Sequence, residues 1–235
     1  MIKFTGPILP LQKTLNKFFK RNNGFIFSDR NRVEYNTMMK EFEIRADYNR
    51  DAIVIYQAYN ETIAKSAVMN QKFSAPFSLN RMTWIKPSFL WMMERSNYGQ
   101  KPGQECTLAI HIKREAWEKA LSKAVLTSPE KRVYPNPGSW EKEFKKAEVH
   151  VQWDPERSIK GNKLAYRSIQ VGISRYLIEE FNNEWIVKIE DYTLLVKKIL
   201  SFTRLGEYDK AKKLLPIEKL YPLTTELAHT IGATI

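Results

Sequence analysis

The chain has 235 residues, a single cysteine and a formal net charge of +12, and 43% of its residues are apolar. This length is typical of one domain that buries its own core, and a lone cysteine excludes an internal disulfide, as is usual in reducing compartments. No apolar run approaches the roughly 18 residues of a membrane span. Pro7 and Pro10 interrupt the short apolar stretch near the start, which makes a poor secretory signal. We therefore expect a cytoplasmic protein with no membrane partner.

The positive charge is concentrated in the flanks of the chain. Residues 1–40 hold eight Lys or Arg and two acidic residues, and residues 197–235 hold seven and four. Residues 41–196 hold the remaining 23 Lys or Arg and 20 acidic residues. Basic segments favour polyanions through counterion release, and they also keep proteins in solution. The flanks are therefore compatible with RNA or DNA contact, with dimer arms or with a solubilising role.

In chain order, residues 1–40 are predicted to be a basic N-terminal extension whose short amphipathic helix packs on the body. The sequence EIRADY (43–48) indicates an edge strand or extended arm, and AIVIYQAY (52–59) is the clearest central strand. A helix follows with Asn60 as its N-cap. The side chains predicted to face inward from this helix are Ile63, Ala67 and Met69.

Residues 81–105 contain the densest apolar block of the chain, FLWMM, with cations on either side. Pro87 fits the first position of a helix, with Ser88 beside it, and the helix is predicted to run to about Arg95. The sequence Asn-Tyr-Gly after it is a stop signal. We predict a core helix with a polar rim that favours an anionic ligand.

The rest of the chain alternates irregularly between strand and helix. Strands are predicted at CTLAIHI, EVHVQW, LAYRSIQVGI and EWIVKIEDYT, and helices at REAWEKALSKAVL, ISRYLIEEFN and a C-terminal hairpin broken at Gly206. Residues 128–146 are the candidate for a flexible flap. No glycine-rich phosphate turn follows a strand, which argues against a doubly wound parallel sheet.

The predicted fold is a single α+β domain with one curved sheet, mixed or mostly antiparallel, of about five or more strands flanked by helices. Residues 41–196 are predicted to form its core, and residues 197–235 a C-terminal helical extension.

Several kinds of catalytic site are disfavoured. The three histidines lack metal-ligand spacing, and nucleophile-elbow, kinase and P-loop signatures are absent. Cys106 begins a strand with no basic partner nearby to form a thiolate. Asp154 and Glu156 of WDPER are either a carboxylate pair for base catalysis or Mg²⁺, or a turn in which Asp154 caps the chain and Glu156 pairs with Arg157.

A recurring pattern places an Arg or Lys at a strand end or turn, next to small hydroxyls and amides. Planar guanidinium donors are the usual solution to phosphate recognition, and aromatic side chains nearby are able to stack on a base. The candidate ligand-binding residues are Arg45, Gln57, Tyr59, Arg81, Lys86, Ser88, Arg95, Gln152, Arg157, Ser168 and Gln170. The candidate catalytic residues are Asp154, Glu156 and Arg167.

The segments IRADY, VIYQAY, RMTWIKPSFLWMMERS, KPGQE, VQWDPER and YRSIQVG together resemble the domain-of-unknown-function family numbered 4291, over roughly residues 43–193. No activity comes with this resemblance. The order of elements is more distantly similar to ADP-ribosyltransferase-like folds, with EIRADY or VIYQAY as the nucleotide-gripping strand and residues 83–88 as the Ser/Thr segment. Glu184 and Glu190 of the final strand lie outside a recognisable acid motif, whereas RNA 2′-phosphotransferases of that fold rely on basic residues.

The function expected from these features is binding of a nucleotide or NAD-like ligand, with transferase chemistry that acts on RNA. NAD and ATP are the candidate cofactors. The alternative is a non-catalytic RNA- or DNA-binding module. In a third interpretation, the arginines form buried ion pairs with Glu43, Asp47, Glu94 and Glu105. In the first, the phosphate-gripping residues are Arg45, Lys86, Arg95 and Arg167, the ribose- or base-orienting residues are Gln57 and Gln152, the hydroxyl donors are Ser88 and Ser168, and the base or cation-stabilising residue is Asp154 or Glu156.

Overall fold

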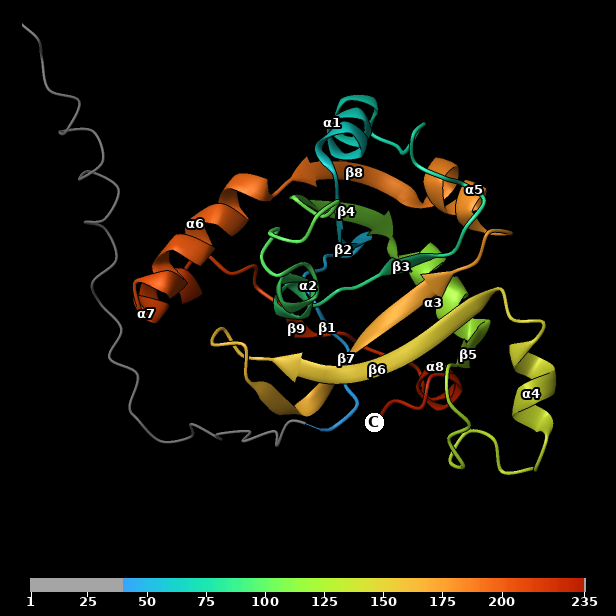
Figure 1. Ribbon diagram of the computed structural model, residues 1–235. Helices are drawn as coiled ribbons and strands as arrows, with labels where there is room; N and C mark the ends of the chain where they lie inside the picture. Colours follow the sequence, from blue (N-terminus) through green and yellow to red (C-terminus); the bar gives the residue numbers. More distant parts are fainter. Residues whose placement is uncertain (1–39, 235) are drawn as a thin grey trace, which may run out of the picture. The chain divides into compact units, whose positions relative to one another are not determined.

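The structure is a computed structural model that describes residues 40–234. The amphipathic helix predicted near the start of residues 1–40 lies outside the described residues. Within the described part, helices and strands alternate irregularly along the chain (Figure 1), and the α+β class predicted from the sequence is confirmed.

The strands of residues 40–234 form three sheets, and the prediction of one curved sheet is wrong. Their bounds are β1 (Arg45–Ala46), β2 (Ala52–Tyr59), β3 (Thr83–Ile85), β4 (Cys106–Lys113), β5 (Ala124–Leu126), β6 (Val149–Arg157), β7 (Lys163–Ile173), β8 (Ile186–Asp191) and β9 (Lys219–Leu220). The order is β2-β4-β8 in one sheet and β3-β7-β6-β5 in another, and β1 pairs with β9. All pairs are antiparallel except β5 with β6. The apolar pattern located most strands but carried no information on their partners.

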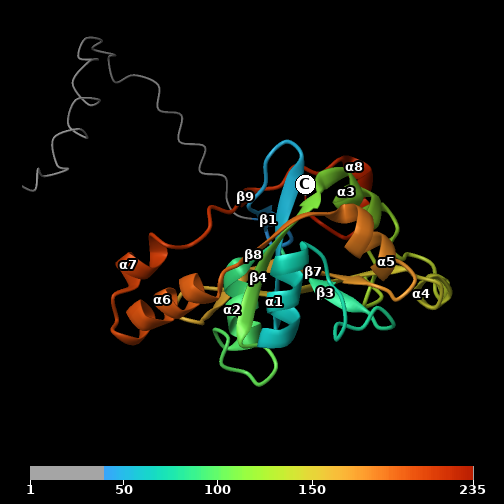
Figure 2. The ribbon, with the colours of Figure 1, turned by 90° about the horizontal axis from the view of Figure 1, so that it is seen from above.

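Helices cover the sheets and connect them. Their bounds are α1 (Glu61–Asn70), α2 (Phe89–Ser96), α3 (Arg114–Ser122), α4 (Ser139–Phe144), α5 (Ile178–Glu180) with the π-helix η1 (Phe181–Trp185), α6 (Thr193–Arg204), α7 (Tyr208–Lys212) and α8 (Thr225–Thr230). In two perpendicular views, α6 and α7 lie at one end of the described part and α4 at the other (Figures 1 and 2). No helix of residues 40–234 is both long enough and apolar enough to cross a membrane.

Strand β2 is buried on both faces although it lies at an edge of its sheet. Ile53 and Ile55 enter one hydrophobic cluster, and Val54 and Tyr56 enter a second one on the opposite face. The free edge of β2 is covered by the chain that leaves β3, because the Tyr56 N–H donates to the Lys86 carbonyl at 2.7 Å. The prediction of a central strand is therefore wrong, since β4 is central. Burial on both faces gives β2 the continuous apolar run that is typical of central strands.

Helix α1 begins at the predicted N-cap. The side-chain oxygen of Asn60 accepts a hydrogen bond from the Ile63 N–H at 3.0 Å. Ala64 and Ala67 are buried, but Met69 is 79% exposed, so its predicted inward position is wrong. The helix turns through about 200° between positions 67 and 69, which takes the later side chain away from the core.

Helix α2 lies between the two larger sheets and contacts β2 and β6 (Figure 1). Its N-cap is Ser88, whose hydroxyl oxygen accepts from the Trp91 N–H at 3.2 Å. Pro87 therefore precedes the cap, and its predicted place at the first helical position is wrong. The helix ends at Asn97, which adopts a left-handed conformation with φ of 50°, within the predicted stop signal.

Three further segments differ from the sequence prediction. The helix REAWEKALSKAVL ends at Ser122, and its last residues AVL form β5 instead, because they pair with β6. Residues 154–157, predicted to begin a charged loop after the strand EVHVQW, are instead the end of β6, and the pairing with β7 continues to Arg157. The hairpin broken at Gly206 is confirmed as α6 and α7, but β9 and α8 follow it and pack on the body.

The close crossing of Trp84 over β7 requires a glycine. Gly172 lies opposite Trp84 in the β3–β7 ladder. A Cβ atom at Gly172 would lie 2.8 Å from the Met82 sulfur and 3.0 Å from the Trp84 ring. The absence of a side chain at Gly172 therefore sets the positions of Met82 and Trp84 above the sheet.

Substitution of Gly172 by alanine should lower the free energy of unfolding by about 1–3 kcal/mol, because the methyl group overpacks against Trp84 and Met82. Urea denaturation measures this loss. A second substitution, Met82→Ala, should recover part of it by removing the nearest clashing atom. An unchanged denaturation midpoint for Gly172→Ala would contradict the packing described here.

Candidate functional site

Two adjoining hollows open beside β2 and β3, with volumes of 170 and 250 Å³. They share four lining residues and together are called the β2–β3 cleft. The shared residues are Tyr59, Arg81, Met82 and Thr83. The smaller hollow is also lined by Gln57, Trp84, Lys86, Met92, Arg95 and Gln104. Five residues predicted from the sequence to bind ligand therefore lie in one cleft, namely Gln57, Tyr59, Arg81, Lys86 and Arg95.

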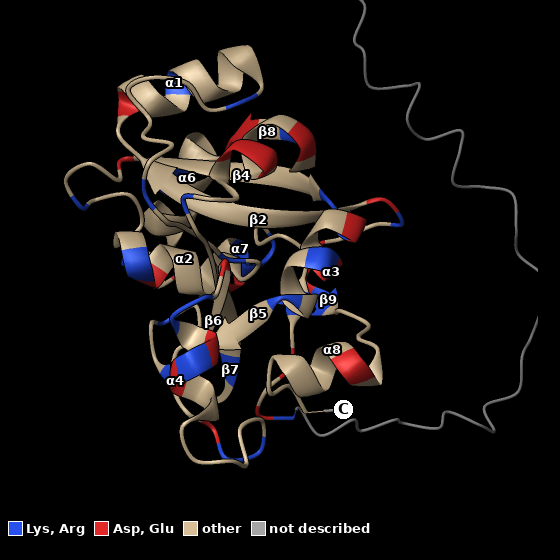
Figure 3. Ribbon diagram, turned by 90° about the vertical axis from the view of Figure 1, so that its right-hand side faces the viewer, with Lys and Arg blue, Asp and Glu red and all other residues tan. Residues whose placement is uncertain are grey.

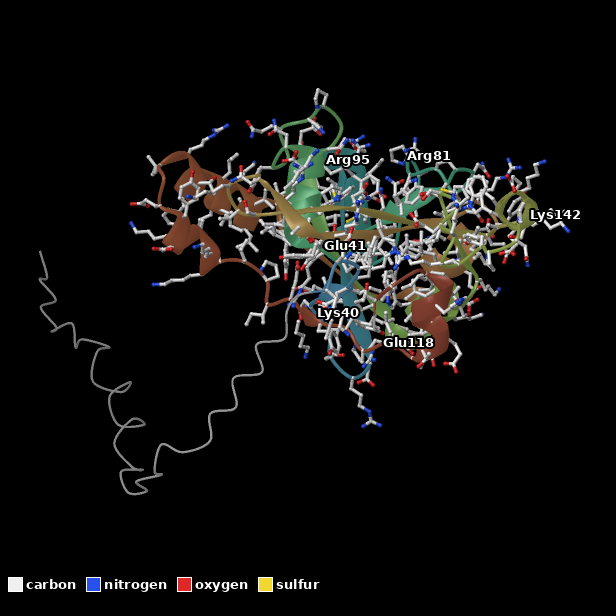
Figure 4. The ribbon with its side chains drawn as sticks, turned by 90° about the horizontal axis from the view of Figure 1, so that it is seen from below. Lys40, Glu41, Arg81, Arg95, Glu118 and Lys142 are labelled. Atoms are coloured by element: carbon white, nitrogen blue, oxygen red, sulfur yellow. The ribbon has the colours of Figure 1, made fainter. Side chains whose placement is uncertain are left out.

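The cleft contains three cationic side chains. Arg81 and Arg95 are exposed and lie on the same side of the molecule (Figure 4), while Lys86 is only 6% exposed. Within residues 40–234, none of the three forms an ion pair with a carboxylate. The buried ion pairs of the third sequence interpretation are therefore not found for these three residues. Unpaired cations that share a hollow favour an anionic ligand.

Lys86 is the most unusual of the three cations. Its amine donates to the Trp84 carbonyl at 3.1 Å and lies 5.2 Å from the centre of the Trp91 ring. Burial and, to a smaller extent, the Arg95 guanidinium lower the pKa of this amine to about 7, while the Asp154 carboxylate acts in the opposite direction. A far larger fraction of this amine is therefore neutral at pH 7 than in an ordinary exposed lysine.

Gln57 supplies an unused hydrogen-bond acceptor to the same cleft. Its amide nitrogen donates to the Thr83 hydroxyl at 2.6 Å and to the Trp84 carbonyl at 3.1 Å. Its amide oxygen is buried and accepts no hydrogen bond from the described residues. A buried acceptor without a partner costs free energy, so a ligand hydroxyl or amine would be stabilised here.

Asp154 is held by two glutamines near the cleft. One carboxylate oxygen accepts from Gln152 at 2.9 Å and the other from Gln170 at 2.7 Å. Gln152 and Gln170 face each other in the β6–β7 ladder, so the three predicted residues form one network. Asp154 influences Lys86 through its charge without forming an ion pair with it. The turn-capping role considered for Asp154 is wrong, because the residue lies inside β6.

The N-terminus of α2 is occupied by the protein's own carboxylates. The Phe89 N–H donates to the Glu218 carboxylate at 2.6 Å, and the Ser88 hydroxyl is hydrogen-bonded to Glu156. Ser88 and Glu156 are 2% and 6% exposed. A ligand phosphate would have to displace Glu218 to reach this helix end. Ser88 and Glu156 are not among the residues that line the β2–β3 cleft.

These two carboxylates lie in one polar cluster with Arg45 and two tyrosines, of which Glu156 and Tyr56 are buried and the others partly exposed. Burial, together with the charge of the nearby Glu156, raises the pKa of Glu218 to about 8, and the hydrogen bond from the Phe89 N–H acts in the opposite direction. Burial also raises the pKa of Glu156. The hydroxyl of Tyr56 is buried without a hydrogen-bond partner among the described residues. Burial raises the pKa of this hydroxyl, and the negative charge of Glu218 makes a second, smaller contribution. Burial raises the pKa of Tyr166, Glu156 and Glu218 of the same cluster also raise it, and Arg45 acts in the opposite direction.

Arg45, predicted to grip phosphate, contacts Glu43 at 3.7 Å, and Arg157 contacts Glu94 at 3.7 Å. These two contacts agree with the ion-pair interpretation. Arg167 donates to Glu41 at 3.1 Å and lies in a separate hollow of 130 Å³.

Ser168 faces Asp154 in the ladder, and its buried hydroxyl has no partner within residues 40–234. The structure does not bring Arg45, Arg157 or Arg167 into the β2–β3 cleft.

Sequence reasoning missed Glu218, which lies in a segment predicted to be a helical extension. No local pattern marks it, because its burial depends on contact with α2, roughly 130 residues earlier. Cys106 is partly buried, and burial raises the pKa of its thiol. Within residues 40–234, no group of three or more His, Cys, Asp or Glu side chains is placed to hold a metal ion.

Comparison with protein families gives one match. The model described as "Domain of unknown function (DUF4291)" matches residues 43–221. The match extends beyond the 43–193 region of resemblance and includes α6, α7 and β9, and therefore Glu218. No curated protein matches the sequence.

Replacing Glu218 by glutamine tests the buried carboxyl group. The pKa of Glu218 is about 8 in the folded protein, above the ordinary value of about 4.3 expected in the unfolded chain. Between these two pH values Glu218 is therefore protonated in the folded protein and ionised in the unfolded chain. The stability that Glu218 contributes is therefore full below pH 4 and is lost as the pH rises through 8. Glu218→Gln should melt at a temperature close to that of the parent at pH 5 and several degrees higher at pH 9.

Differential scanning fluorimetry across this pH range measures the effect. The matched control is Glu184→Gln, an exposed substitution that should follow the parent at both pH values. A difference in melting temperature between Glu218→Gln and the parent that stays constant from pH 5 to pH 9 would show that Glu218 titrates normally.

Proposed function

The chain belongs to the DUF4291 family, and we propose that its β2–β3 cleft binds the phosphate groups of a nucleotide or NAD-like ligand and carries out transfer chemistry on it. The proposal is carried by one observation. Lys86 is buried, lacks a carboxylate partner in the described residues, and shares a cleft with Arg81 and Arg95. Removal of a cation from water is costly unless an anion compensates it, and phosphate oxygens would provide that compensation.

The remaining lining of the cleft suits the other parts of a nucleotide. The free amide oxygen of Gln57 would accept from a ribose hydroxyl or a base amine. Tyr59 and Trp84 line the cleft and offer aromatic faces or edges to a base. Asp154 is held in place by two glutamines, and its charge acts on Lys86, so it is the carboxylate that we assign as a base or as the stabiliser of positive charge on the ligand. Glu156 is not assigned this role, because it lines neither hollow and lies at the N-terminus of α2.

The finer parts of the proposal go beyond the family match. A relation to ADP-ribosyltransferase-like folds and an RNA substrate stay predictions from the sequence. The cleft supports phosphate binding whether or not they hold, because its cations, its free acceptor and its aromatic residues are local features of β2, β3 and α2.

The second candidate function is a non-catalytic nucleic-acid-binding module. It is favoured by residues 193–220, which include α6, α7 and β9 and contain seven Lys or Arg and three acidic residues. Figure 3 shows acidic and basic positions interspersed along the ribbon of the described residues. RNA binding that falls steeply with salt, together with no binding of ATP or NAD, would favour this module over the nucleotide cleft.

Removal of a cleft cation should weaken binding of NAD or ATP. The exposed Arg95 is replaced by alanine, and we expect a loss of roughly tenfold or more, because a hydrogen bond to a charged group is worth about 1.5–3 kcal/mol. Thermal-shift titration measures it, since a ligand at about 100 times its Kd adds roughly 2.7 kcal/mol of stability. The titration is run at low and at high salt.

The matched control for Arg95→Ala is Lys131→Ala, an exposed cation outside the cleft lining. This control should leave the ligand-induced shift unchanged. Equal shifts for the parent and Arg95→Ala with both ligands would argue against the cleft as the phosphate site.

A further inference from the structure

Lys86 is held in one place at the cleft. Its backbone carbonyl accepts from the Tyr56 N–H at 2.7 Å, and Pro87 restricts its backbone to an extended conformation. Its amine donates to the Trp84 carbonyl at 3.1 Å beside the Trp91 ring. A neutral amine can make this donation and keep its lone pair free. The side chain thus presents one nitrogen to the ligand at a fixed position.

The charged groups around Lys86 act on its amine in opposite directions, and the cation has the larger effect. Arg95 of α2 lines the same hollow and disfavours a positive charge on Lys86, and Arg81, just before β3, lines the hollow as well. Asp154 of β6 favours the ammonium form, but both of its oxygens already accept hydrogen bonds. From β2, the neighbouring polar group is the uncharged Gln57. A lysine removed from water beside a guanidinium is the usual setting of an amine that acts as a nucleophile.

We infer that Lys86 is a nucleophilic lysine, whose amine forms an imine with the carbonyl carbon of a phosphate-bearing aldehyde or ketone in the β2–β3 cleft. The inference rests on the proposed function for the phosphate contacts, and it adds a covalent step and a chemical class of ligand. Arg81 and Arg95 hold the phosphate at the rim of the cleft. With such a ligand the two guanidinium groups take the phosphate, so Lys86, behind them, stays neutral and meets the carbonyl group.

The covalent step balances with the groups present. The nitrogen lone pair of Lys86 adds to the carbonyl carbon, and the C=O π electrons move to the oxygen, which takes the proton that the nitrogen loses. The resulting carbinolamine expels water as the C=N bond forms. No oxidant or reductant is needed.

The experiment uses the full chain and two probes, pyridoxal 5′-phosphate and pyridoxal, which differ by the phosphate group. Each is mixed with the protein at pH 7, the imine is reduced with borohydride, and modified lysines are located by peptide mass spectrometry. An ordinary exposed lysine of pKa about 10.4 is neutral in roughly one molecule in 2,500 at this pH. We expect pyridoxal 5′-phosphate to label Lys86 at least tenfold faster than the exposed Lys131 and Lys142.

Two controls keep the test specific. Lys86→Arg should lose the fast label while its near-UV circular dichroism matches that of the parent, and ATP should protect Lys86 in the parent. Fast labelling by both probes at equal rates would support the nucleophile and contradict phosphate binding in the cleft. Labelling of Lys86 no faster than that of Lys131 by either probe, at pH 7 and at pH 8, would overturn the inference.

Discussion

The hydrogen bond from the Tyr56 N–H to the Lys86 carbonyl joins the two larger sheets at the point on which the site depends. It covers the free edge of β2 with the chain between β3 and α2. It therefore fixes where Lys86 enters the cleft and where α2 begins. The apolar sequence of α2 then follows from its position, because the helix fills the space between the two sheets and is packed on most sides.

The start of α2 separates two polar regions of different chemistry. Beneath it, Glu156 and Glu218 approach each other and the helix N-terminus, where burial and mutual repulsion raise the pKa of Glu218. Beside it, Lys86 and Arg95 face the open cleft without carboxylate partners in the described residues. In the acidic cluster, Glu218 accepts a hydrogen bond from the first turn of α2. In the cleft, the cations have no such partner among the described residues, and an anionic ligand would supply one.

The sequence singled out several residues that the structure places in one cleft, but it did not predict how the strands divide into sheets. Gln57, Arg81 and Lys86 were found because polar side chains at the ends of apolar strands are conspicuous, and such ends meet at one edge. The partners of the strands were not predictable from the sequence. Strand β2, for example, has the apolar pattern of a central strand because both of its faces are buried, although it lies at the edge of its sheet. Glu218 was missed for a similar reason. Its contact with α2 spans roughly 130 residues of sequence, and no spacing or composition marks it.

The central claim is that Lys86 is a buried amine without a compensating anion until a phosphate-bearing ligand arrives. The most direct measurement is the pKa of its amine by nuclear magnetic resonance, with ¹³C-labelled methyl groups placed on the lysines, before and after addition of ATP or NAD. The account predicts a pKa near 7 in the free protein, which rises on ligand binding because phosphate stabilises the ammonium form. An ordinary lysine pKa of about 10.4 in the free protein, unchanged by either ligand, would contradict it.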